Sequence, residues 1–145
     1  MPQSDTQSDD SPNTIVAVLR WILVLPAAAL AGLLASILVN AGNRITMWMQ
    51  GYDPDSFVPR LFIDAISSAV MGAGTVWAGA RTAPSHKTVV VFVLAAVSIA
   101  VAGMMSFPAI ITRSGWAIYA IIWWIVGASA VAWSVYSGEM TEADL

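Results

Sequence analysis

The sequence predicts an all-α membrane protein, a four-helix transmembrane bundle with both termini on the same side. Of its 145 residues, 58% are hydrophobic and 10% are charged, compared with about 45–50% and about 25% in soluble domains. The apolar residues gather in four long stretches, and most of the acidic residues lie near the two ends of the chain. These observations predict a single transmembrane domain, residues 15–136, between two short acidic tails.

The N-terminal tail, residues 1–14, is polar. Asp5, Asp9 and Asp10 stand there among Ser, Gln and Pro, and the apolar side chains are too few to offset the entropy of ordering the segment. We expect it to be disordered. The acidic C-terminal tail, residues 137–145, has the same character, and we expect it to be solvated and without a fold.

The first predicted span, residues 15–39, is apolar except for Arg20 and Ser36. About 20 such residues cross a hydrocarbon core roughly 30 Å thick. The small-residue run 27–32 resembles a signal-peptide cleavage site, but the preceding region is acidic and the apolar stretch continues well beyond the run, which favours a retained anchor. We expect Pro26 to kink this helix and the Arg20 side chain to extend toward the headgroups.

The connection between the first two spans, residues 40–60, is the longest predicted loop. Ile45, Trp48 and Met49 recur there at helical spacing, which indicates a short interfacial helix. The sequence 53–56, Asp-Pro-Asp-Ser, then predicts a turn, because proline fixes φ and carboxylates accept hydrogen bonds from nearby backbone N–H groups. Two carboxylates without regular ligand spacing do not make a calcium site, which needs roughly six to eight oxygen ligands.

Three further spans, 61–80, 88–105 and 116–136, complete the predicted bundle. The segments between them carry Gly, Pro and nearly all of the remaining charges. Trp and Tyr prefer the headgroup level of a membrane, and most of them fall near the ends of the predicted spans. Trp123 and Trp124 are the exception, and we expect them to pack deeper.

The orientation depends on Lys and Arg near the helix ends, and the two sides tie. Three bases on the side of the termini oppose three on the other side, namely Arg20, Arg81 and Lys87 against Arg44, Arg60 and Arg113. The loop 81–87 concentrates its bases in a short stretch, which favours cytoplasmic termini. We interpret the chain as a multi-pass protein of a bacterial-type cytoplasmic cell membrane, with the lipid bilayer as its first partner.

One face of the second predicted span combines small and polar side chains. At about 100° per residue, that face collects Asp64, Ser68, Gly72, Thr75 and Gly79. The opposite face carries larger apolar residues. Small residues permit close approach of helix backbones and hydroxyls bond between helices, so the first face predicts packing inward or against a partner.

Asp64 is the one acidic residue inside a predicted span. Charges within the hydrocarbon are costly, and by default they indicate a proton, ion or partner role. Asp64 nevertheless lies about one turn into its span and one turn after Arg60, which favours a hydrated or ion-paired carboxylate in the interface over a transport role. With Arg60, Arg113, Ser68 and Thr75 it makes up the candidate polar site for an ion or a partner.

Small residues in the first and fourth spans predict further packing faces. Gly32 and Ser36 stand one turn apart in the first span, and Gly127 lies in the fourth. Together with Gly72 and Gly79 of the second span, these are the residues that we expect at helix–helix contacts.

Several function classes are excluded by composition. Nine acidic residues, six basic residues and a net charge of -3 leave no basic surface for nucleic-acid phosphates. With no Cys and a single His, His86, the sequence offers no metal ligand set and no plan for a nucleophilic triad. We therefore expect neither an enzyme nor a cofactor-binding protein.

The function that remains is that of a small membrane accessory or interaction subunit acting through helix packing, with a membrane-protein partner or in a homo-oligomer. The alternative is a small oligomeric transporter or channel subunit in which Asp64 attracts or couples an ion. The acidic C-terminal tail weakens a third idea, a holin-like lysis role, because it lacks a basic cluster.

Overall fold

Four α-helices make up the part of the chain that the computed structural model describes, residues 11–83, 86–141 and 145. They are α1 (Ser11–Met49), α2 (Phe57–Thr82), α3 (Lys87–Ile111) and α4 (Gly115–Tyr136). Each is long and apolar enough to cross a membrane. The predicted all-helical class and the four candidate spans are therefore confirmed, and the chain is a multi-pass integral membrane protein.

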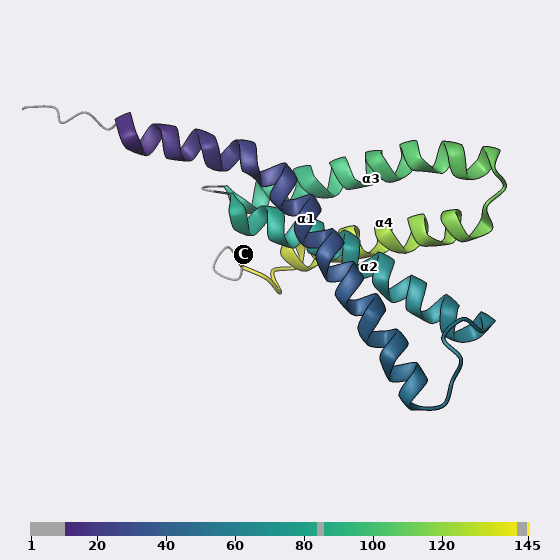
Figure 1. The fold of residues 1–145 in the computed structure, drawn as a ribbon. Coiled ribbons are helices and arrows are strands. Elements are labelled where there is room, and N and C mark those ends of the chain that lie inside the picture. The colour runs from purple at the N-terminus through teal and green to yellow at the C-terminus, as the bar shows by residue number, and fades with distance from the viewer. Residues whose placement is uncertain (1–10, 84–85, 142–144) are drawn as a thin grey trace, which may run out of the picture.

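The second helix is the centre of the arrangement. Within the described residues α2 packs against all three other helices, whereas the backbone of α1 closely approaches that of α2 alone. Figure 1 shows α1 crossing α2 and diverging from the α3–α4 hairpin, whose two helices lie side by side. The backbones of α1 and α3 therefore have no close approach within the described residues.

The first helix is longer than the sequence predicted. It begins at Ser11, inside the predicted tail 1–14, whose residues 1–10 lie outside the described part, and it continues without interruption to Met49. Its 39 residues extend to about 58 Å at roughly 1.5 Å per residue. The helix changes direction in its N-terminal half (Figure 1), where Pro26 lies inside it and removes one backbone hydrogen bond.

Residues 40–49, assigned to a loop from the sequence, are the last turns of α1. The predicted interfacial helix is thus part of α1, and the connection shrinks to residues 50–56. The polar side chain of Asn40 does not break the helix because its Nδ2 donates to Ser67 Oγ of α2 at 3.3 Å. Gly51 then ends the helix with a φ of 80°, a conformation that glycine adopts without strain.

The predicted turn at residues 53–56 is present in the structure. The Asp53 carboxylate accepts a hydrogen bond from the Asp55 backbone N–H at 3.0 Å. Ser56 Oγ donates to the Asp53 carbonyl at 2.7 Å. Arg44 of α1 pairs with Asp55, so an ion pair joins the end of α1 to this turn.

Helices α2 and α3 are also longer than predicted, and each has a proline in the added part. Helix α2 begins at Phe57, before the predicted start at residue 61. Helix α3 continues past the predicted end at residue 105 to Ile111 with Pro108 inside it, and Pro59 lies in the first turn of α2, where a missing N–H breaks no helix bond. After α3, Arg113 takes a φ of 50°. Ser114 then caps α4, its Oγ accepting a hydrogen bond from the Ala117 N–H at 3.3 Å.

The core lies near the ends of α2, α3 and α4 on the side of the C-terminus. Val76, Ala80 and Val91 are fully buried there, and Leu145 joins the same cluster with 1% of its surface exposed. Met140 packs against the cluster from outside. Leu145 of the predicted solvated tail thus finds cover against the helix ends, while residues 142–144 of that tail lie outside the described part.

Candidate functional site

The α1–α2 contact is built from small residues on both helices. A Cβ atom on Gly32 would lie 2.7 Å from the Met71 carbonyl oxygen, and one on Gly79 would lie 2.8 Å from the Ala28 Cβ. Both distances are shorter than van der Waals contact, so the two helices approach this closely only because these positions are glycine.

The α2–α4 contact brings two helix backbones together in the same way. A Cβ atom on Gly127 would lie 2.6 Å from the Ala69 carbonyl carbon. One on Gly72 would lie 2.9 Å from the Ala128 nitrogen. Glycines from both helices therefore form this contact, and a side chain at either position would push α2 and α4 apart.

These contacts place four of the five predicted packing residues between helices of the same chain. Gly32, Gly72, Gly79 and Gly127 are buried against a neighbouring helix, and Ser36 is half-buried on α1. A single sequence does not indicate whether such residues pack within the chain or against a partner. A surface for a partner has to consist of other residues.

Asp64 lies beside Arg60 at the beginning of α2. Its Oδ2 is 3.8 Å from Arg60 Nε, and one third of its side chain is exposed. The Arg60 guanidinium also lies 4.8 Å from the centre of the Trp116 ring of α4, a cation–π distance. The charge of Asp64 thus has a partner one helical turn away, as its spacing from Arg60 indicated.

No hydrogen bond or ion pair among the described residues joins this pair to the other members of the predicted polar site. Arg113 is exposed in the α3–α4 connection, and Ser68 is half-buried on α2. Thr75 is eleven residues beyond Asp64, about 16 Å along the helix, and its Oγ1 donates to the Met71 carbonyl at 2.7 Å. The structure therefore does not bring the five residues into one cluster.

An aromatic row that the sequence analysis missed joins α2 to α4 at the same end. Phe57, Trp116, Tyr119 and Trp123 meet edge to face, with ring centres 6.1–6.3 Å apart. The Tyr119 hydroxyl also donates to the Leu61 carbonyl at 3.1 Å. Trp123 belongs to this row, and only Trp124 turns toward the interior.

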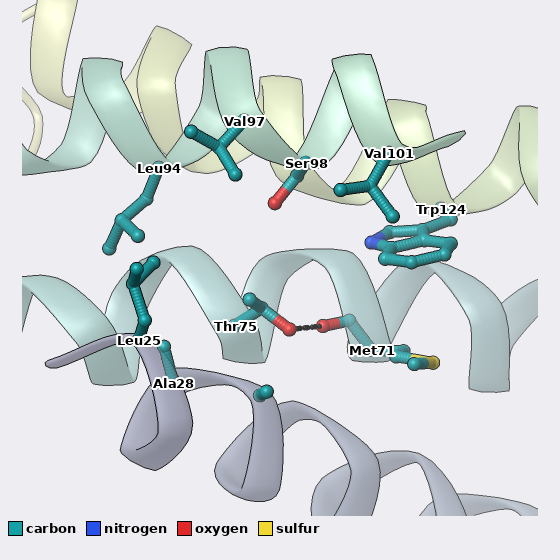
Figure 2. A pocket seen from close by; sticks show the side chains of 10 residues that line it. Leu25, Ala28, Met71, Thr75, Leu94, Val97, Ser98, Val101 and Trp124 are labelled. Atoms are coloured by element: carbon teal, nitrogen blue, oxygen red, sulfur yellow. Dashed lines mark hydrogen bonds between the residues drawn. The ribbon is translucent and has the colours of Figure 1, made fainter. Parts of the chain in front are cut away.

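A cavity of about 300 Å³ lies where all four helices meet. Its lining consists of Leu25, Ala28, Ala29, Met71, Thr75, Leu94, Val97, Ser98, Val101 and Trp124. Figure 2 shows the Ser98 hydroxyl and the Trp124 indole nitrogen directed into the space between α2 and α3. Trp124 Nε1 is buried and has no hydrogen-bond acceptor among the described residues. This cavity has the polar features of a binding site within an apolar lining.

A second hollow, of about 460 Å³, lies on the outer surface between α3 and α4. We call it the alanine groove. Its small residues are Ala95, Ala96, Ser129 and Ala132, and its large residues are Phe92, Ile99, Trp133 and Tyr136. The Trp133 and Tyr136 rings lie 5.7 Å apart at one end. Unlike the internal glycine contacts, this groove has small side chains that the chain itself leaves exposed.

The described residues offer no cluster of three or more His, Cys, Asp or Glu side chains that would hold a metal ion. The fold and these hollows define the class as a multi-pass membrane protein with an internal cavity and an external groove. Comparison with known proteins adds no relative, since no protein-family model, curated protein or solved structure matches the chain. The function is therefore argued from the geometry.

Proposed function

We propose that this protein is a membrane accessory or interaction subunit that binds one transmembrane helix of a partner protein in the alanine groove. The observation that carries the proposal is the set of small, accessible side chains between α3 and α4. Ala96 and Ser129 are exposed in the isolated chain, and Ala95 and Ala132 lie beneath them with less exposure. A partner backbone is able to approach closely over such residues.

The shape of the groove supports a helix as the occupant. It runs along residues 92–99 of α3 and 129–136 of α4, about 10 Å or two turns of each helix. The same helices already use small residues to pack closely inside the chain, as at Gly127, and the aromatic side chains of the groove add contact area to a docked helix.

The membrane orientation belongs to the same proposal. We infer four complete crossings, with both termini on one side of the membrane. The bases Arg81 and Lys87 of the α2–α3 connection support cytoplasmic termini by the positive-inside rule, in a cytoplasmic cell membrane.

The alternative function, a small transporter or channel subunit that uses Asp64, has less support. The Asp64 carboxylate lies near Arg60, whose positive charge compensates the charge that would otherwise attract a cation. Asp64 is also not among the residues that line the four-helix cavity. A pathway needs an unpaired charge beside an open space, whereas the Asp64 carboxylate is paired with Arg60 and does not line the cavity.

Site-specific photo-crosslinking in the native membrane tests the proposed docking surface. A photoreactive phenylalanine analogue is introduced at Ser129, inside the groove, and separately at Ala130, the next residue, which is exposed outside it. We expect the Ser129 probe to capture one partner through its transmembrane segment and the Ala130 probe to capture lipid. Ala96→Leu, which fills the groove, should abolish the Ser129 crosslink.

Two results would contradict the proposal. Crosslinks from Ser129 to lipid alone would mean that the groove is part of the lipid-facing surface. Crosslinks to a second copy of this chain would mean that the groove is a homo-oligomer contact. That result would favour the alternative function, an oligomeric transporter or channel subunit. Retention of a folded, monodisperse Ala96→Leu protein in mild detergent is the control that makes its loss of crosslinking interpretable.

A further inference from the structure

The four-helix cavity contains one buried hydrogen-bond donor that the described residues do not satisfy. The Trp124 indole N–H can only donate, and Nε1 is buried without an acceptor among the described residues. Trp124 is the tenth of the 22 residues of α4, near the middle of the span. Water is scarce at that depth, so an unpaired N–H is destabilising there.

Ser98 supplies a second donor beside the first. Only 5% of the surface of Ser98 is exposed. Figure 2 shows its hydroxyl directed into the same space as the Trp124 nitrogen. Thr75 lies across from Ser98 but already donates to the Met71 carbonyl at 2.7 Å. The polar chemistry of the cavity therefore calls for an acceptor atom near Ser98 and Trp124.

The remaining lining limits what can carry that acceptor. Among the described residues, the cavity wall has no Asp, Glu, Lys, Arg or His, so an ionised group would be buried there without a counter-charge. Its volume, about 300 Å³, lies at the lower end of the range for ligand pockets. A compact, neutral and mostly apolar group fits these limits.

A hollow lined by α1 and α3 gives such a molecule room for a tail. A neighbouring hollow of about 290 Å³ lies between these two helices. It shares Leu25, Leu94 and Val97 with the four-helix cavity, so the two spaces adjoin along one apolar wall. Leu25 of α1 and Val93 of α3, which line this second hollow, are exposed on the surface of the chain.

From these observations we infer that the four-helix cavity binds a neutral, membrane-soluble molecule with a carbonyl group, whose oxygen accepts hydrogen bonds from Trp124 Nε1 and Ser98 Oγ. Its hydrocarbon tail lies between α1 and α3. A lipid-soluble quinone and a neutral ester lipid share this chemistry. The site is separate from the alanine groove and does not depend on the proposed partner.

Benzophenone is a suitable probe, because it is a compact apolar ketone and reacts with nearby C–H bonds when illuminated. The excited carbonyl abstracts a hydrogen atom, and the two carbon radicals then join. The full-length protein in lipid nanodiscs is irradiated with benzophenone, and the adducts are mapped by mass spectrometry. We expect saturable labelling of Met71, Leu94 and Val97, which line the cavity.

Competition on the unmodified protein tests the hydrogen bonds without any variant. Phenyl benzoate retains the carbonyl, whereas diphenylmethane has two similar rings and no acceptor. We expect phenyl benzoate to displace benzophenone about tenfold more effectively, the ratio that one net hydrogen bond gives. Equal competition by the two compounds would overturn the proposed role of the donors.

Matched variants locate the donors. Trp124→Phe and Ser98→Ala should each lower labelling of the cavity about fivefold or more. Two control variants should leave the labelling unchanged. They are Trp123→Phe, at the residue before Trp124, and Ser106→Ala, at a serine whose hydroxyl donates to the Ala102 carbonyl on α3. Labelling that follows lipid exposure along all four helices, or falls equally in all variants, would overturn the site.

Displacement of benzophenone by two further competitors, a prenylated benzoquinone and a diacylglycerol, identifies the class of the natural ligand. Displacement by the quinone alone identifies a quinone site, and displacement by the diacylglycerol alone identifies an ester-lipid site. Displacement by both supports a general carbonyl site. Displacement by neither contradicts the inference that a membrane-soluble carbonyl compound occupies the cavity.

Discussion

At the scale of single residues, the fold depends on positions that have no side chain. The α2–α4 contact places Gly127 against the Ala69 backbone and Gly72 against the Ala128 backbone. Gly103 of α3 offers a contrast, since a Cβ atom there would have nothing within 4 Å. The importance of a helical glycine in this protein is thus set by its neighbours and cannot be inferred from residue type.

Gly127→Ala should destabilise the protein by about 1–3 kcal/mol, because the new methyl group forces α2 and α4 apart. Gly103→Ala is the matched control and should be neutral or stabilising by up to about 1 kcal/mol, since alanine favours helix. Denaturant titration in mixed micelles measures both. Equal effects of the two substitutions would show that α2 and α4 do not pack as described.

Asp64→Asn should change stability by less than about 1 kcal/mol, because an exposed ion pair contributes little. Arg60→Gln should have the larger effect, since it also removes the contact of the guanidinium with the Trp116 ring. The same titration compares them, and ion flux in proteoliposomes is measured in parallel. Abolished flux in the Asp64 variant, with a folded protein, would restore the transporter alternative.

At the scale of elements, the sequence predicted the four helices but not all of their ends. Long apolar stretches identify spans because every backbone group in hydrocarbon needs an internal partner. Residues 40–49 and 106–111 were assigned to loops because they contain polar residues or proline. In the structure both segments are helical. Asn40 bonds to Ser67 of α2, and Pro108 lies near the end of α3.

The candidate sites were predictable only where they depend on local spacing. The Arg60–Asp64 pair follows from one helical turn, and the small face of α2 follows from helical periodicity. The aromatic row and the four-helix cavity join residues far apart in the chain, such as Leu61 and Tyr119. No spacing rule connects these residues, so a single sequence could not indicate that they meet.

Leu145→Ala should destabilise the protein by about 2 kcal/mol or more, because the Leu145 side chain is buried against the ends of the helices. Met104→Ala provides the control, since Met104 of α3 is 75% exposed and loses few contacts within the chain. Thermal unfolding in detergent compares the two. A neutral Leu145→Ala would mean that the last residue does not anchor the tail in solution.

At the scale of the whole molecule, α2 holds the structure together, and α1 has α2 as its single close neighbour within the described residues. Because α1 packs closely on α2 alone, its apolar outer surface depends on lipid or a partner for cover. At about 58 Å, α1 also exceeds the roughly 30 Å of a hydrocarbon core. It therefore tilts or extends beyond the membrane at an end.

The absence of native cysteine makes this topology directly measurable. Single substitutions Met49→Cys and Ser137→Cys should react with a membrane-impermeant maleimide from opposite sides of the membrane, and His86→Cys should react from the same side as Ser137→Cys. Leu34→Cys, within α1 in the apolar stretch, should be protected. Labelling of Met49→Cys and Ser137→Cys from one side would contradict four complete crossings.

The most direct test of the interaction function is native mass spectrometry of the tagged protein, purified at its native level in mild detergent. We predict a complex with a different membrane protein at fixed stoichiometry, which Ala96→Leu removes and Ala130→Leu retains. A discrete homo-oligomer, or a monomer with lipid alone, in the wild-type protein would contradict the proposed role as an interaction subunit.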